Sequence, residues 1–226
     1  MLNNIAVYIA ERDVFYREDD DGVYSIESFL AVYTLLEVPF EIISSLIFAV
    51  LATFAVNLPR TTESCLSVAL ACFAIVSCGE SLGIIFNTLF RHAGFAVNIV
   101  ATLLSVAQTM SGLMSIDMPR VFVIFNHLSP IKYTTAFLMP YTLNGIEFTC
   151  EDAQRLPPVT GQCPIETGDD VLRLYKMEND RPVVDVATLI GLVVAYRLLA
   201  WAVLRVVRTR WSSLLWKTRG GGKTIP

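Results

Sequence analysis

Four long apolar runs dominate this chain, and they restrict it to a fold that crosses a membrane. The runs cover residues 30–56, 65–86, 95–114 and 183–207. About 20 predominantly apolar residues cross a bilayer core of roughly 30 Å as one helix. Charged residues make up 17% of the chain, against roughly 25% in ordinary soluble domains. We therefore predict an all-α integral membrane protein with about four full spans and the end of a fifth, which residues 1–10 would supply.

Two polar segments, one before the first run and one between the third and the last, indicate the topology. Residues 11–25 mix charges of both signs with aromatic residues, which favours an element held at a membrane surface. Residues 116–182 begin as an apolar stretch broken by prolines, typical of re-entrant helices, and continue as polar loop. From Arg205 onward the tail carries basic charges and no acid. Because basic residues favour the cytoplasmic side, we predict that the C-terminus and residues 11–25 are cytosolic and that residues 116–182 are extracellular.

The five cysteines fall into two groups. Cys150 and Cys163 lie in the predicted outer loop, where an oxidising compartment permits a disulfide. Closing this short loop would stabilise it by about 3 kcal/mol on the chain-entropy model. The alternative is a pair of free thiols in the loop. The other three cysteines lie in the second apolar run, where we expect small buried hydrophobes.

Motifs of catalysis are absent from the sequence. It contains no phosphate-binding glycine and lysine loop, no Gly-x-Ser-x-Gly and no paired metal-ligand spacing, and it has only two histidines. A chain without a phosphate-cradling loop is not expected to hydrolyse ATP by itself. We therefore expect no enzyme activity, no metal and no cofactor in this chain.

Ionisable residues inside the apolar runs are the strongest sign of function, because each costs at least about 2.5 kcal/mol to insert. Glu37 and Glu41 share one face of the first run, Glu80 lies in the second, and Arg197 lies in the last. A rise of about 1.5 Å per residue places them at overlapping depths. We predict a polar relay in which Arg197 pairs with Glu37 or Glu80. The alternative is that these side chains only snorkel to the inner interface.

Four motifs, in order along the chain, resemble the G-subfamily of ABC transporters, the white-pigment and pleiotropic-drug-resistance type. Residues 11–25 with the following Glu37-Val38-Pro39 resemble its first intracellular loop and next helix. Residues 111–114 resemble the end of its fifth helix, motifs within 128–150 its third extracellular loop, and residues 195–198 its sixth helix. The resemblance covers nearly the whole chain and implies helices three to six of an ABC type-2 permease.

The resemblance implies a permease that dimerises with a second permease half and exports lipids, sterols or hydrophobic xenobiotics. ATP and Mg²⁺ would bind an associated nucleotide-binding domain; membrane lipid is a further expected partner, and nucleic acid is not. Residues 11–25 would be the coupling segment that rests on this domain. Its expected docking residues are Arg12, Phe15, Tyr16, Arg17, Glu18 and Tyr24.

The same resemblance implies that one helical face of the third run lines the central substrate cavity. Leu103, Ala107 and Met110 share one helical face at i, i+4 and i+7, and ordinary packing or lipid contact is the other reading. Two further functions stay open: a standalone permease subunit that pairs with a separate ATPase, and a truncated membrane protein that does not transport. The short first segment also suggests a fragment or a gene model begun at an internal methionine. Plasma and internal membranes are both compatible with the sequence.

Overall fold

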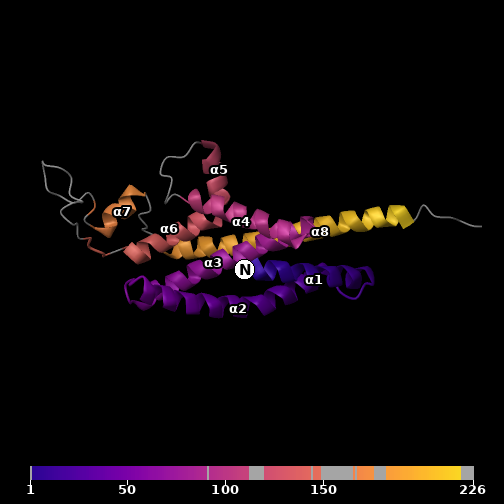
Figure 1. Cartoon of the computed structure of the whole chain (residues 1–226), viewed down its shortest axis with the longest axis horizontal. Coiled ribbons are helices and arrows are strands. Elements are labelled where there is room, and N and C mark those ends of the chain that lie inside the picture. The colour runs from indigo at the N-terminus through magenta and orange to yellow at the C-terminus, as the bar shows by residue number, and fades with distance from the viewer. Residues whose placement is uncertain are drawn as a thin grey trace, which may run out of the picture. The chain divides into compact units, whose positions relative to one another are not determined.

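The computed structural model describes residues 2–90, 92–111, 120–143, 145–148, 165, 167–175 and 182–219. Eight helices occupy most of this part of the chain (Figure 1). They are α1 (Leu2–Asp20), α2 (Ile26–Ala55), α3 (Thr62–Leu89), α4 (Ala93–Thr109), α5 (Arg120–Leu128), α6 (Pro130–Leu143), α7 (Gly168–Leu174) and α8 (Pro182–Arg219). The predicted all-α membrane class is confirmed.

Three helices are long and apolar enough to cross a membrane, over Ile26–Ala55, Thr62–Leu89 and Val183–Thr209. They match three of the four predicted runs, and the first of these runs extends one residue beyond its helix. The remaining run, residues 95–114, falls on α4, which has 17 residues and is shorter than a full span. Residues 112–119 lie outside the described part of the chain. Helices α5, α6 and α7 lie within the predicted outer loop, and their re-entrant character stays a prediction.

The chain forms two compact units, each described here by itself. The first unit comprises Met1–Glu41, Val76–Leu104 and Leu192–Pro226, and the second comprises Ile42–Ile75 and Ser105–Gly191. The first unit holds the N-terminal helix and the polar residues of the predicted relay. The second unit holds the turn between α2 and α3 and the segment with α5, α6 and α7.

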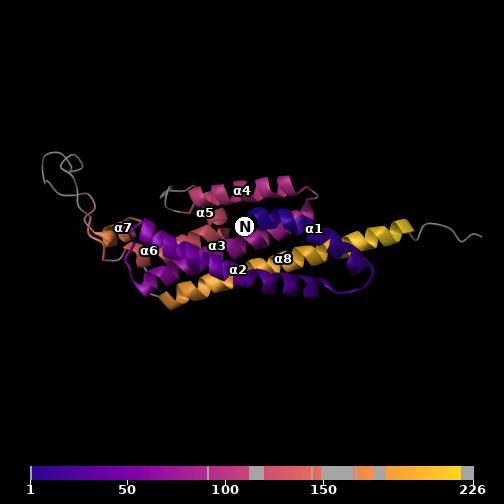
Figure 2. The ribbon, with the colours of Figure 1, turned by 60° about the horizontal axis from the view of Figure 1, so that its bottom comes forward.

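In the first unit, α1 is one helix from Leu2 to Asp20. The sequence suggested two elements, a helix end over residues 1–10 and a coupling segment from residue 11, but the structure joins them in this helix. Phe15 is fully buried and stacks on Phe29 of α2, with ring centroids 4.3 Å apart. Gly22 turns the chain with a φ of +72°, a conformation that glycine adopts without steric cost. Figure 2 shows the chain turning back here, from the end of α1 into the start of α2.

The core of the first unit joins four helices, α1, α2, α3 and α8. Tyr8 of α1, Leu30 of α2, two isoleucines of α3 and Ala200 of α8 form one buried cluster. Tyr8 also packs edge-on against Tyr33, with centroids 5.4 Å apart. This cluster sets the positions of α1, α2, α3 and α8 within the unit.

In the second unit, small residues bring α2 and α3 together. Ala49, Val68 and Ala69 form a buried cluster there, and small side chains allow the close helix approach that is common in membranes. Asn57 ends α2 in the left-handed region with a φ of +54°, and the Leu58 amide bonds back to the Thr53 carbonyl at 3.1 Å. This matches the left-handed termination common at helix C-termini and the predicted end of the first run.

Helix α7 is held against α6 at a position that only glycine can occupy. Thr167 caps α7 by a capping box with Asp170, and the Gly168 amide bonds to the Ile146 carbonyl at 2.8 Å. A Cβ at Gly168 would lie 1.9 Å from the Leu143 carbonyl oxygen. Backbone, not a flexible side chain, blocks this space.

We expect Gly168→Ala to destabilise the second unit by about 1–3 kcal/mol, the usual cost of overpacking. The apparent melting temperature of the purified complete transporter measures this effect. Gly191→Ala is the matched control, because a Cβ there meets nothing within 4 Å. Equal melting temperatures for the two variants would contradict the predicted clash.

Candidate functional site

Arg12 ties α1 to the end of α3. The residue is 6% exposed, and its Nη1 donates to the Phe90 carbonyl at 3.1 Å and to the Asn87 carbonyl. These carbonyls belong to the C-terminal end of α3, where helix acceptors have no partner within the helix. Asp13 holds the same guanidinium by an ion pair of 2.7 Å. Arg12 therefore satisfies and fixes a helix end.

The burial of Arg12 and Phe15 corrects the predicted docking surface. Both side chains are directed into the first unit, because Arg12 bonds to the end of α3 and Phe15 stacks on Phe29 of α2. Neither is accessible to a partner domain. The accessible part of the coupling segment is narrower than the sequence suggested and includes Arg17, which is exposed, and the partly exposed Glu18.

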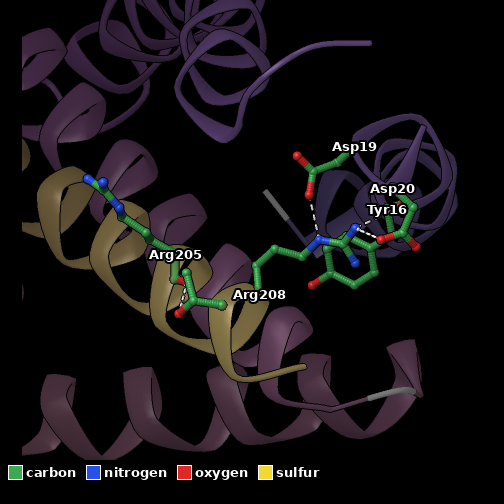
Figure 3. A network of polar contacts seen from close by, with 6 residues as sticks. Tyr16, Asp19, Asp20, Arg205 and Arg208 are labelled. Carbon is green, nitrogen blue, oxygen red and sulfur yellow. Dashed lines mark hydrogen bonds and ion pairs between the residues drawn. The ribbon is translucent and has the colours of Figure 1, made fainter. Parts of the chain in front are cut away.

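Arg208 fastens the other side of the coupling segment to α8, as Figure 3 shows. Its Nε donates to the Asp19 carboxylate at 2.5 Å. Its Nη2 donates to the Tyr16 carbonyl at 3.0 Å and to the Asp20 carboxylate. The residue is 6% exposed, so these charge-assisted bonds are shielded from water. We call Arg208, Tyr16, Asp19 and Asp20 the α8 clamp.

Tyr16 lies between two guanidinium groups. The Cζ atom of Arg208 is 5.1 Å from its ring centroid, and that of Arg12 is 5.6 Å away. Both distances lie within the range of cation–π attraction. The ring thereby links the contact to α3 with the contact to α8, and α1 is held from both sides.

Arg205 precedes Arg208 on α8 and makes a much weaker contact. Its Nη1 lies 3.7 Å from the Glu27 carboxylate, and both side chains are more than half exposed. Its guanidinium also stacks over the Trp201 ring at 5.1 Å. An exposed pair of this kind adds little stability.

Tyr24, in the turn after α1, contacts two other residues of the predicted coupling segment. The Tyr24 hydroxyl donates to the Glu18 carboxylate, and this bond raises the pKa of Tyr24. The Tyr24 ring also stacks on Phe15, with centroids 5.7 Å apart. Tyr24 therefore stabilises the turn that joins α1 to α2.

The four intramembrane ionisable residues meet in the first unit. Carboxylate oxygens of Glu37 and Glu41 from α2 and of Glu80 from α3 lie within 4.8 Å of one another. Glu41 is 4% exposed and Glu80 is 3% exposed. Glu37 shares hydrogen bonds with Tyr33 and Glu80 and is attracted by Arg197 of α8. The structure thus brings the predicted relay residues together, with Tyr33 added, and their relay role stays a prediction.

The charges of this carboxylate cluster are unequal, with three acids near one guanidinium. The Arg197 Nη atoms are buried and make no hydrogen bond within the part of the chain described. Hard cations prefer carboxylate oxygens, so this cluster is also the set of acids here that could hold one. We predicted no metal for this chain, and that expectation stays untested.

The remaining predicted residues are less informative. Leu103 on α4 is 46% exposed; Ala107 is partly exposed, and Met110 follows the last residue of the helix. Their place in a cavity stays a prediction. Cys150 and Cys163 lie outside the described residues.

The sequence reasoning missed the α8 clamp. Arg208 lies 188 or more positions from Asp19 and Asp20 along the chain, and the sequence analysis counted it only among the basic residues of the tail. The signal available was an acidic run at the end of α1 together with a basic last helix, both predicted to be cytosolic.

Comparison with known proteins decides the family. Residues 1–141 match the profile of the ABC-2 type transporter family. The chain belongs to this family. It is 37% identical over 207 residues to an uncharacterized ABC transporter ATP-binding protein/permease of Saccharomyces cerevisiae, a match that covers 91% of the chain.

Two relatives of this ABC-2 type transporter confirm the resemblance to the G-subfamily. ABC transporter G family member 2 of Dictyostelium discoideum is 24% identical over 92% of the chain. Human ATP-binding cassette sub-family G member 5 is 26% identical over 74% of the chain. The chain spans only 16%, 17% and 26% of the length of the three relatives. It is therefore a G-type ABC membrane domain that matches a small part of each relative.

Proposed function

We propose that this permease domain serves an ATP-driven exporter of lipid, sterol or hydrophobic xenobiotic substrates. ATP and Mg²⁺ would bind an associated nucleotide-binding domain, and a second permease half would complete the substrate path. The C-terminus would lie in the cytosol with α1, and the membrane could be the plasma membrane or an internal one. The name of the yeast relative includes both an ATP-binding protein and a permease, which favours a motor in the same polypeptide over a separate ATPase subunit.

The observation that carries this proposal is the way α1 is held. Arg12 bonds to the end of α3, and Arg208 bonds α8 to the last turn of α1. A displacement of α1 by a nucleotide-binding domain would move two membrane helices at once, because both contacts are short and buried. Rigid elements joined in this way transmit motion without a flexible linker.

The carboxylate cluster of Glu37, Glu41 and Glu80 would respond to this motion within the membrane-spanning helices. Helices α2, α3 and α8 each contribute a charged side chain to it. A shift of α8 relative to the other two would change the distance between Arg197 and the carboxylates. Charges in a low-dielectric region interact strongly, so small shifts of this kind would separate two states of the permease.

Arg17→Glu tests the proposed docking surface, because Arg17 is the exposed basic residue of the last turn of α1. In the complete transporter we expect the transport per ATP hydrolysed to fall on the order of tenfold, since close charge pairs across an interface couple by about 1.5 kcal/mol or more. Substrate binding should stay unchanged. Proteoliposomes allow both ATP hydrolysis and export of a fluorescent lipid to be measured.

Arg60→Glu is the control for this test. Arg60 is also exposed, but it belongs to the turn between α2 and α3 in the second unit. We expect this variant to couple normally. Normal coupling in Arg17→Glu as well would show that the exposed side of α1 does not contact the motor.

A further inference from the structure

A groove in the second unit has the size of a small-molecule site. It encloses about 660 Å³, within the roughly 300–1,000 Å³ of typical ligand pockets. It lies between the turn after α2, the start of α3, α6 and the start of α8, and its described lining residues all belong to this unit. The two helices joined by this turn have the length and composition of membrane spans, and they end at Ala55 and begin at Thr62. The groove is therefore near a membrane surface.

Hydroxyl groups line one wall of this groove. Thr61, Ser64 and Ser67 all line it, and their spacing of three residues places them on one side of the first turns of α3. Ser64 is 1% exposed, and its Oγ makes no hydrogen bond within the described part of the chain. Leaving a buried hydroxyl without a partner costs free energy, so a ligand that bonds to Ser64 would gain affinity.

The hydrogen bonds already present decide which kind of group this wall can bind. The Thr61 Oγ1 accepts a hydrogen bond from the Ser64 amide at 3.2 Å, and the Ser67 Oγ donates to the Glu63 carbonyl at 2.7 Å. Ser67 can therefore only accept from a ligand, whereas the Ser64 hydroxyl can both donate and accept. Neighbouring hydroxyl groups of a ligand would satisfy both residues, because each hydroxyl donates one hydrogen bond and accepts others.

The remaining lining of the groove is largely apolar and aromatic. Phe137 and Tyr141 of α6 lie with ring centroids 5.2 Å apart, and Pro140 lines the groove beside them. Leu66 also lines it and is 66% exposed. Glu63 is the one charged residue among the described lining residues, and it is exposed to water. These walls favour a neutral ligand that has several hydroxyl groups on one side and carbon–hydrogen groups on the other, as a sugar ring has.

We propose that this groove binds the neutral sugar head group of an amphipathic glycoside, with the sugar hydroxyls on Ser64 and Ser67 and the ring against Tyr141. The apolar chain lies along Leu66, on the part of α3 that is able to cross the membrane. The groove shares no residue with the α8 clamp or with the cavity face predicted on α4. Binding here does not depend on the transport activity proposed above.

Octyl glucoside with a photoreactive diazirine in its chain is the probe. It is irradiated with the complete transporter in lipid nanodiscs, and the labelled peptides are identified by mass spectrometry. We expect label on residues 61–70 or 137–141, and we expect Ser64→Ala to lower this labelling about fivefold, as the loss of one hydrogen bond does. The same chain with a methyl ether in place of the sugar should label Ser64→Ala and the unmodified protein equally. Val186→Trp should lower labelling by the glucoside at least as much as Ser64→Ala, because Val186 lines the groove and an indole ring fills it.

Thr62→Ala is the matched control, since Thr62 carries an exposed hydroxyl outside the groove. It should be labelled as the unmodified protein is. Equal labelling of Ser64→Ala and the unmodified protein by the glucoside would overturn the proposal and indicate that water alone occupies this wall. An equal loss of both probes in Ser64→Ala, or no label on either peptide, would also overturn it. Ser64→Ala removes a hydroxyl that bonds to none of the described residues, and size-exclusion profiles verify that the variants fold.

Discussion

Arg208→Ala should separate ATP hydrolysis from transport and lower the stability of the complete transporter. The substitution leaves Asp19, Asp20 and the Tyr16 carbonyl without their donor. Removing one partner of a buried ion pair costs about 3–5 kcal/mol. Asp20 is 54% exposed and Asp19 is 23% exposed, so water and salt replace part of the interaction. We expect a net loss of about 2–3 kcal/mol, measured as a lower apparent melting temperature.

We expect the export per ATP hydrolysed to fall more than the lower stability alone would explain. Without the α8 clamp, α1 can move while α8 stays in place, so hydrolysis should continue and export should fall. Arg208→Lys should recover only part of the export, because an ammonium group keeps the charge but cannot form the forked contacts of a guanidinium. ATPase and export rates in proteoliposomes measure this difference.

Arg205→Ala provides the control from the same turn of α8. Its ion pair with Glu27 spans 3.7 Å between exposed side chains, so we expect a change of no more than about 0.5 kcal/mol. Coupling should be normal in this variant. Equal effects of Arg205→Ala and Arg208→Ala would show that the basic charge of α8 matters and that the clamp geometry does not.

Arg197→Met should have the second large effect. The substitution keeps the apolar stem and removes the positive charge near Glu37, Glu41 and Glu80. The clustered carboxylates then repel one another without a nearby positive charge. The Arg197 Nη atoms make no hydrogen bond among the described residues, but Arg197 attracts Glu37, and its loss removes the positive charge from a cluster of buried carboxylates. We expect a strongly lowered apparent melting temperature and a reduced yield of folded protein.

The double variant Arg197→Met with Glu37→Gln should recover part of this loss, because the neutral amide no longer needs a positive partner. We expect a coupling energy of about 1 kcal/mol or more in the double-mutant cycle, the range found for residues in contact. Glu63→Gln combined with Arg197→Met should be additive, since Glu63 belongs to the second unit. Additivity for Glu37 as well would contradict the pairing of Arg197 with this carboxylate.

The carboxylate cluster shows which features of the site could be predicted from the sequence. The spacing of Glu37 and Glu41 places them on one helix face, and counting residues from the span ends places Glu80 and Arg197 at a similar depth. These arguments use only helix geometry. They cannot supply the rotation of each helix about its axis, which packing around Tyr8, Leu30 and Ala200 determines. Tyr33 precedes Glu37 by four residues on α2, so helix spacing places both on one face, and this signal was available in the sequence but was not used.

The polar segment that follows Ala10 shows the opposite case. Its charge density predicted an element at a membrane surface, which stays a prediction, and the structure places the turn between α1 and α2 at Gly22. The sequence could not divide its charged residues into those that face a partner and those that face the fold. Arg12 and Arg17 are alike in composition, yet one is 6% exposed and the other is exposed. The difference depends on which face of α1 lies against α3 and α8.

The sequence by itself determined the class of this protein, its long spans and its family, because the hydrophobic effect and backbone hydrogen bonding leave a chain with such apolar runs no other fold. Only the tertiary structure decided which charges are paired. Arg12 with the end of α3, and Arg208 with the end of α1, are contacts between residues at least 75 positions apart. Such contacts depend on how helices rotate and pack, and no local pattern in the chain encodes them. Within the coupling segment that the sequence placed at the surface, Arg12 and Phe15 are buried, and these two side chains contact α3 and α2.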